Sequence, residues 1–187
     1  MNRPQWSTAV ALAAWVTATG ALVFGSACSS FDSSAISRVN LPDKDQFITQ
    51  NVSLFMERRC GALDCHGQIG RPLRIYSSSG LRMNDGKNGS RDVSATTMEE
   101  RVANYFAVVG LEPEEITIAR DSAQNGQPRF TDFLLLLKPL GIDQGGVRHK
   151  GGSVLRSTDS GFDCMAFWIE GEDAAKIKPK CDDGAIQ

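Results

Sequence analysis

Two cysteines and a histidine lie within seven consecutive residues, and they constrain the fold of this chain more than any other feature of its sequence. Cys60 and Cys65 are separated by four residues, and His66 follows Cys65 directly. Thiols this close can be joined as a disulfide, can bind a metal ion together with the imidazole, or can form thioether bonds. Each alternative requires a tight loop at this point of the chain.

The order of these residues is the one that covalent attachment of haem requires. Two cysteines react with the haem vinyl groups and the following histidine binds the iron, although the usual signature has two residues between the cysteines. Zinc is an alternative, because Cys60, Cys65, His66 and a remote His149 offer four nitrogen and sulfur ligands. Structural zinc sites usually pair two clusters, however, and this sequence has one. The third alternative is a Cys60–Cys65 disulfide with His66 at the surface.

The N-terminal segment has the layout of a secretory signal. Residues 6–27 contain no charged side chain, and Arg3 precedes them. Small residues crowd the end of this run and lead directly to Cys28, which resembles a bacterial lipoprotein signal. We therefore expect residues 1–27 to be removed and Cys28 to be acylated. A retained transmembrane helix is the alternative, since about 20 apolar residues suffice to span a bilayer.

A lipid anchor would leave a domain on a tether outside the cytoplasm. Residues 28–44 are expected to be flexible because they are rich in Ser and Asp. The protein would be periplasmic or at the cell surface, anchored to the outer rather than the inner bacterial membrane. Removing Arg3 with residues 1–27 leaves 19 of the 20 Lys and Arg against 22 Asp and Glu. No basic run indicates nucleic acid binding.

No enzyme activity is expected from the motifs in this chain. It contains no G-x-S-x-G, no H-E-x-x-H and no phosphate-binding loop.

Four cysteines follow Cys28, and an even number in an exported chain indicates disulfides. Cys164 and Cys181 form the second natural pair. Their disulfide would hold the C-terminal segment to the last predicted helix and would stabilise the fold by about 3 kcal/mol.

Apolar residues recur at helical spacing in four segments after the tether. Thr97 and Glu100 predict a capping box for the second helix. Thr131 can cap the third helix, which Pro139 ends, and Gly171 ends the fourth. The four segments are residues 45–59, 98–109, 132–138 and 162–170.

Long glycine-rich loops separate the predicted helices. The stretches 67–90 and 141–160 contain few apolar residues with which to order themselves. Asp85-Gly86 and Asn88-Gly89 are hairpin dipeptides, which predict a short β-ribbon or an irregular loop. The expected fold class is therefore mostly α, a small helical domain with long glycine-rich loops.

Three segments together resemble the cytochrome c-like domains of planctomycetes and myxobacteria, many of which are predicted lipoproteins. The resemblance covers residues 45–172 and leaves residues 173–187 as a C-terminal tail. In such folds the helix that bears the attachment site packs across a C-terminal helix that bears an aromatic residue, a place that Trp168 occupies here. The three segments are Arg59-Cys60 through Cys65-His66-Gly67, Leu137–Gly141 leading to His149–Gly152, and Ala166–Gly171.

The resemblance implies one haem c attached to Cys60 and Cys65, with His66 as the proximal iron ligand. His149 is the first candidate for the distal ligand, because neighbouring glycines would let the backbone approach a planar group. Met83 is the alternative. The implied function is electron transfer to redox partner proteins of the cell envelope. A haem-less, disulfide-stabilised lipoprotein that acts in binding or structure, with no cofactor, is the second hypothesis.

Overall fold

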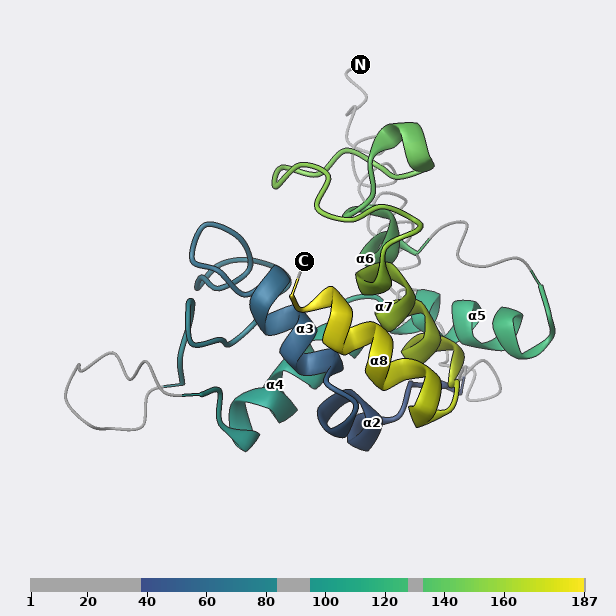
Figure 1. Ribbon diagram of the computed structural model, residues 1–187, viewed down its shortest axis with the longest axis horizontal. Helices are drawn as coiled ribbons and strands as arrows, with labels where there is room; N and C mark the ends of the chain where they lie inside the picture. The colour runs from purple at the N-terminus through teal and green to yellow at the C-terminus, as the bar shows by residue number, and fades with distance from the viewer. Residues whose placement is uncertain (1–37, 84–94, 128–132, 187) are drawn as a thin grey trace, which may run out of the picture. The chain divides into compact units, whose positions relative to one another are not determined.

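The structure is a computed structural model of the 187-residue chain and describes residues 38–83, 95–127 and 133–186. Val39–Gln187 form a compact unit by themselves. The described residues of this unit form seven α-helices and one 3₁₀ helix (Figure 1). They are α2 (Lys44–Thr49), α3 (Val52–Arg59), α4 (Met98–Val109), α5 (Pro113–Gln124), α6 (Leu134–Leu137), η2 (Ile142–Gln144), α7 (Ser160–Glu170) and α8 (Ala174–Gly184).

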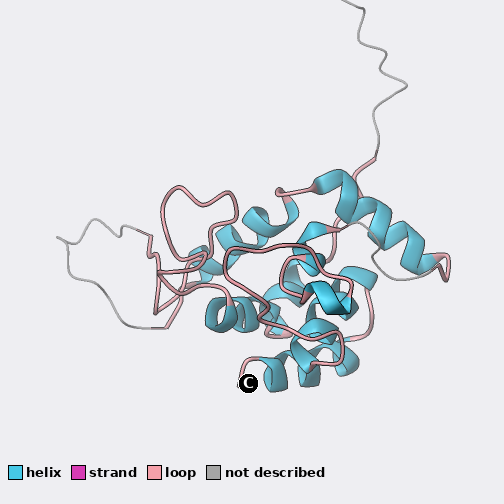
Figure 2. Cartoon of the chain, turned by 90° about the horizontal axis from the view of Figure 1, so that it is seen from above, coloured by secondary structure: helices cyan, strands magenta, loops and turns pink. Residues whose placement is uncertain are grey.

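The prediction of a mostly helical domain with long loops is confirmed. Figure 2 shows helices joined by extended loops, and the described residues contain no sheet. Extended chain pairs there only as two isolated bridges, Tyr76 with Leu81 and Leu140 with Leu155. The hairpin dipeptides at residues 85–89 lie outside the described residues, so the β-ribbon stays a prediction.

Two predicted helix boundaries are confirmed in atomic detail. The Thr97 hydroxyl accepts a hydrogen bond from the Glu100 amide at 3.2 Å, and the Glu100 carboxylate accepts one from the Thr97 amide at 2.9 Å. This capping box starts α4. Gly171 ends α7 with a φ of 79°, a left-handed conformation that glycine adopts without strain. The proposed cap Thr131 lies outside the described residues, which place Phe133 directly before α6.

The prediction of one continuous helix over residues 45–59 is wrong, because the chain turns between α2 and α3. Asn51 has a φ of 62°, and asparagine is among the residues that tolerate this conformation. Its side-chain amide donates to the Asp182 carboxylate at 2.6 Å, which holds the turn against α8. The change of direction lets Phe47 of α2 and Phe55 of α3 both reach the core.

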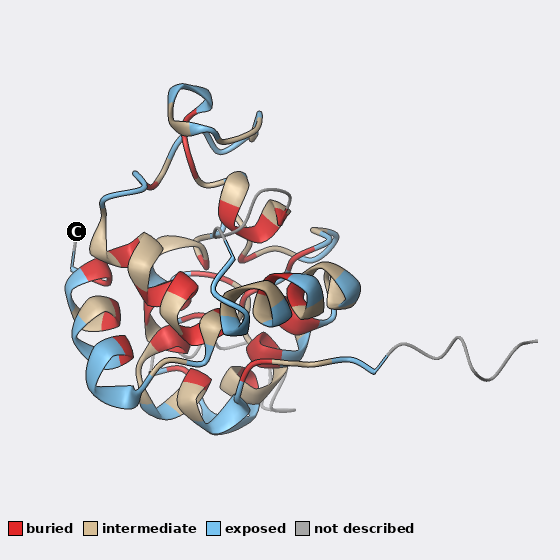
Figure 3. Cartoon of the chain, turned by 90° about the vertical axis from the view of Figure 1, so that its right-hand side faces the viewer, coloured by how far each residue is buried: buried red, intermediate tan, exposed pale blue. Residues whose placement is uncertain are grey.

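Trp168 lies at the centre of the helical core. Its ring is fully buried, with its centroid 4.9 Å from that of Phe47 and 6.3 Å from that of Tyr105. The indole N–H donates to the Asp43 carbonyl at 2.8 Å, and the Tyr105 hydroxyl donates to the Pro42 carbonyl at 2.9 Å. These contacts bring α7, α2 and α4 together. Figure 3 shows the buried residues on the helix faces that point inward.

Most of the predicted C-terminal tail, residues 173–187, forms a helix: Ala174–Gly184 are α8, which belongs to the same compact unit as the other helices. The predicted Cys164–Cys181 disulfide is present and joins α7 to α8, with both cysteines fully buried. A Cβ added at Gly184 would lie 2.6 Å from the Gly161 Cα, so the two helices approach closely. Pro179 lies inside α8. Because proline usually disrupts a helix, the sequence does not predict α8.

Replacing both Cys164 and Cys181 with alanine should lower the free energy of unfolding by about 3 kcal/mol, because the unfolded chain regains the freedom of a loop of this size. Urea unfolding monitored by circular dichroism measures the loss. A reductant should lower the wild-type midpoint and leave that of the double variant unchanged. Equal stability of the two proteins without reductant would contradict a stabilising crosslink.

Candidate functional site

The segment between the two cysteines forms a closed turn at the end of α3. The Cys60 amide donates to the Met56 carbonyl at 2.8 Å and so continues the helix to its last residue. The Cys60 carbonyl then accepts the His66 amide at 2.9 Å, while the Ala62 carbonyl accepts the Cys65 amide at 3.0 Å. Both cysteines are free thiols. The turn thus presents the two thiols and the imidazole of His66 from one short segment.

Three glycines let this turn lie directly on the next part of the loop. A Cβ at Gly67 or at Gly80 would collide with the carbonyl oxygen of Gly61. The Ser77 hydroxyl donates to the same carbonyl at 2.6 Å. Residues 61–67 and 77–80 therefore make backbone contact that no larger residue at these glycines permits.

Buried polar side chains of α4 hold the loop from the other side. The Asn104 amide group is fully buried, and it accepts from the Tyr76 amide at 2.7 Å and donates to the Tyr76 carbonyl at 2.9 Å. The Glu100 carboxylate accepts from the Arg82 guanidinium at 2.8 Å and from the Met83 amide at 2.8 Å. The loop from Cys60 to Met83 is thereby fixed on α4 at two points.

The Glu100 carboxylate is held in its ionised form. Burial alone would raise its pKa, but hydrogen bonds from Arg82, Thr97 and Met83 outweigh burial and lower the pKa below its usual value. Glu100 therefore stabilises the folded state when it is ionised, and this contribution is lost as the pH falls through the lowered pKa.

The fold brings the two histidines of the chain together. The ring centroids of His66 and His149 lie 6.0 Å apart, and the ring planes are within 10° of parallel. His66 Nδ1 lies 3.0 Å from the Leu73 carbonyl oxygen, and His149 Nδ1 lies 3.2 Å from that of Gly152. A carbonyl oxygen only accepts, so each Nδ1 carries a proton, and in the neutral imidazole Nε2 then keeps a free lone pair. Both imidazoles are thus in the tautomer that coordinates a metal through Nε2.

The loop that carries His149 is closed at its base and tied to α3. The Pro139 carbonyl accepts the amides of Val154 and Leu155 at 2.9 and 3.0 Å. The guanidinium of Arg59, the last residue of α3, donates to the Val154 carbonyl at 3.0 Å. Arg59 therefore links the loop of His149 directly to the helix that ends at the cysteine turn.

The surroundings of the site lower the pKa of His66 and raise the pKa of both thiols. Burial lowers the pKa of His66 and outweighs the hydrogen bond to the Leu73 carbonyl, which raises it. The nearby His149, Arg71 and Lys138 lower this pKa further. Burial raises the pKa of the Cys60 thiol to about 12 and also raises that of Cys65. A neutral imidazole is the form that binds a metal.

The other predicted site residues are placed as follows. The backbone amide of Met83 is bound to Glu100, and its side chain is 38% exposed, whereas His149 is the residue found beside His66. Cys28 lies outside the described residues. Within the described ranges, no three side chains of His, Cys, Asp and Glu form a cage for a metal ion. No helix in those ranges is long and apolar enough to cross a membrane.

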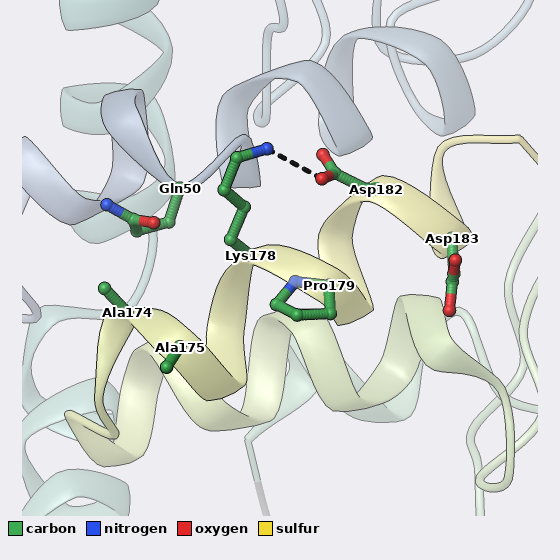
Figure 4. A pocket seen from close by; sticks show the side chains of 7 residues that line it. All are labelled: Gln50, Ala174, Ala175, Lys178, Pro179, Asp182 and Asp183. Atoms are coloured by element: carbon green, nitrogen blue, oxygen red, sulfur yellow. Dashed lines mark hydrogen bonds and ion pairs between the residues drawn. The ribbon is translucent and has the colours of Figure 1, made fainter.

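A groove of about 560 Å³ lies elsewhere, between α8 and the end of α2 (Figure 4). A Lys178–Asp182 ion pair of 2.7 Å spans part of it. None of its lining side chains carries a thiol or an imidazole. They are Gln50, Ala174, Ala175, Lys178, Pro179, Asp182 and Asp183.

Sequence reasoning missed the residues that position the histidines and the cysteine turn. Arg59 stands directly before Cys60 in the resembling motif, so its position was a usable signal. Asn104 gave no such signal, because an asparagine within an amphipathic helix is expected at the surface. The two carbonyl acceptors, from Leu73 and Gly152, belong to the main chain and leave no trace in the sequence.

Comparison of the chain with models of protein families, with curated proteins and with solved structures finds no match in any of the three.

Replacing Glu100 with glutamine should lower the free energy of unfolding by about 1–3 kcal/mol at neutral pH, because buried donors lose a charged acceptor. The difference from wild type should shrink as the pH falls through the lowered pKa of Glu100, because Glu100 itself is then protonated. Urea unfolding over a series of pH values from neutral to acidic measures both effects. Glu99→Gln, at an exposed position of the same helical turn, is the control and should match wild type. If the difference in unfolding free energy between Glu100→Gln and wild type is independent of pH, the ionised carboxylate does not have this role.

Replacing Arg59 with methionine should free the base of the His149 loop, because the Val154 carbonyl loses its charged donor. Amide hydrogen exchange at Val154 and Leu155 should accelerate about tenfold, as expected from a bond of this kind. Arg58→Met changes the neighbouring, exposed arginine and should leave these amides unaffected. Equal exchange in the two variants would show that Arg59 does not hold the loop.

Proposed function

We propose that this chain is an electron-transfer protein of the cell envelope that carries one covalently attached haem c. The pairing of its two histidines is the observation that carries the proposal. His66 and His149 come from loops far apart in the sequence, yet their rings are parallel and 6.0 Å apart. Each directs its Nδ1 proton to a backbone carbonyl and so keeps Nε2 available as a ligand.

The pairing of the rings would let both imidazoles bind one metal ion. Their ring centroids lie 6.0 Å apart, close enough for both side chains to reach one metal ion with metal–nitrogen bonds of about 2 Å. Hydrogen bonds from Nδ1 to the carbonyls of Leu73 and Gly152 fix the ring orientations and raise the basicity of the ligands. This supports His149 over Met83 as the partner of His66.

Further side chains near His66 fit a haem. The free thiols of Cys60 and Cys65 belong to the same closed turn as His66 and would form the thioether bonds. The Nε of Arg71 is buried without a hydrogen-bond partner among the described residues. A haem carboxylate is an acceptor that would satisfy it, and Lys138 adds a second positive charge near His66.

The chemistry that haem supplies when bound is a reversible one-electron couple. The residues of the chain hold and tune it. His66 and His149 would bind the iron, the cysteines would hold the macrocycle, and Asn104 and Glu100 keep the cysteine loop in place. The chain turns over no substrate in this proposal.

The proposed location is outside the cytoplasm, on a lipid anchor at Cys28 in the outer membrane. The apolar run of residues 6–27 and the small residues before Cys28 support it. The Cys164–Cys181 disulfide also suits an oxidising compartment. The partners would then be redox proteins of the cell envelope.

A haem-less binding or structural module is the second candidate. It is favoured by the direct contacts that close both loops without a ligand, from Ser77 to Gly61 and from Arg59 to Val154. In that case Cys60 and Cys65 would form a disulfide in the oxidising compartment.

Expression in a host with a c-type haem maturation system tests the two candidates. The intact mass should equal the processed chain plus one haem, and the reduced pyridine haemochrome spectrum should be that of haem c. Cys60→Ala and Cys65→Ala should each remove a thioether bond and shift the haemochrome band. An apo mass with two disulfides would overturn the electron-transfer proposal in favour of the second candidate.

The distal ligand is tested in the same holoprotein. His149→Ala should move the Soret band and change the reduction potential, because the iron loses a nitrogen ligand. Met83→Leu is the matched variant and should leave both unchanged. The opposite pattern would assign the ligand to Met83.

A further inference from the structure

An exposed apolar stripe runs along α4. Met98 is 57% exposed and Phe106 is 59% exposed, and the half-buried Val102 lies between them in the sequence. Residues four apart lie one above the other on a helix, so the three side chains share one face of α4. Phe106 is the only exposed aromatic side chain in the part of the chain that the structure describes.

The fold itself does not use this stripe. The buried face of α4 includes Tyr105 and Val108, while Asn104 and Glu100 hold the loop that follows the cysteine turn. The ring of Phe106 meets that of Tyr105 edge to face at 5.3 Å, yet more than half of its surface stays in contact with water. An exposed apolar patch that the core does not need is typical of a surface that another molecule covers.

The stripe is complementary to a second copy of itself. Met98 and Phe106 lie four residues before and four residues after Val102, which is about 6 Å along the helix in each direction. Two α4 helices that cross antiparallel at Val102 would bring Met98 of each copy against Phe106 of the other. A thioether against an aromatic ring is a favourable contact, and a two-fold axis forms it twice.

The charged residues of α4 do not oppose this pairing. Glu99 is exposed at one end of the stripe, and in the antiparallel arrangement it would lie near the far end of the other stripe, away from the other Glu99. Glu100 is buried, and Arg101 is bound to Glu57 at 3.2 Å. Like charges therefore do not meet at the centre of the contact.

A membrane is another surface that covers apolar helix faces, and the charges of α4 argue against it. Helices that lie on anionic membranes carry Lys and Arg beside their apolar face. In α4 the residues next to Met98 are Glu99 and Glu100, and its one basic residue, Arg101, is already paired. The charges thus favour a second copy of the chain over a lipid surface.

We propose that α4 is a self-association surface at which two copies of this chain pair antiparallel through Met98, Val102 and Phe106. A helix of 12 residues offers a contact of roughly a few hundred square ångströms, below the about 800 Å² per partner that stable complexes bury. The pairing is therefore weak and depends on protein concentration. It uses neither the histidines nor the cysteines, so it stands apart from the proposed function.

Sedimentation equilibrium over a wide range of protein concentration tests this proposal, with the purified mature protein in an excess of neutral detergent micelles. Wild type should approach a dimer as its concentration rises. Met98→Lys and Phe106→Glu should each raise the dissociation constant at least about tenfold, because each places a charge without a partner in the contact. Ile118→Glu changes a side chain of α5 that is 58% exposed, and this control should match wild type.

A charge exchange across the two-fold axis tests the antiparallel geometry. The double variant Met98→Lys with Phe106→Glu should regain dimer formation, because each new lysine would face the new glutamate of the other copy. The two positions are about 12 Å apart along one helix, too far to pair within a copy. An equal mixture of the two single variants should likewise form heterodimers. Circular dichroism checks that every variant is folded.

Four outcomes would overturn the proposal. Wild type that stays monomeric at every concentration would exclude self-association, and association that survives both single variants would place the contact elsewhere. Loss in the single variants without recovery in the double variant would exclude the antiparallel pairing. Binding to phosphatidylglycerol vesicles that Phe106→Glu abolishes, without self-association, would assign the stripe to a membrane. None of these measurements depends on haem, so failure of the proposed function leaves their result unchanged.

Discussion

The arrangement of the candidate site depends on buried hydrogen bonds between α4 and the loop that follows the cysteine turn. Asn104 satisfies both main-chain groups of Tyr76, and Glu100 binds Arg82 and the Met83 amide. Each bond contributes only about 1 kcal/mol net, but a buried polar group left without its partner costs about 1–3 kcal/mol. The loop is thus held by groups that are costly to separate, although it has few apolar side chains of its own.

The helical core provides the platform for these bonds. Trp168 packs against Phe47 and Tyr105, which fixes α4 relative to α2 and α7. The Cys164–Cys181 disulfide holds α8 against α7. Different interactions therefore stabilise the two regions of the protein. Apolar burial stabilises the helices, whereas polar contacts and backbone packing stabilise the loops. The histidines lie in the second region.

The sequence predicted those features that local chemistry determines. The capping box of Thr97 and Glu100 and the end of α7 at Gly171 follow from side chains within one helical turn. The disulfide followed from cysteine count and export. The break at Asn51 was not predictable, because it depends on Asp182, which is distant in the sequence. Helix α8 was missed since Pro179 argues against a helix, and only contact with α7 overrides that preference.

The candidate site likewise has one part that the sequence predicts and one part that it does not. Cys60, Cys65 and His66 are adjacent, so their grouping is evident from the sequence alone. The proximity of His149 depends on how Pro139 and Arg59 close a remote loop, which no spacing rule encodes. The orienting acceptors of both imidazoles are main-chain oxygens of Leu73 and Gly152. No side-chain replacement at those two positions deletes an acceptor, because the path of the backbone determines the ring orientations. These orientations can therefore persist while the surrounding sequence diverges.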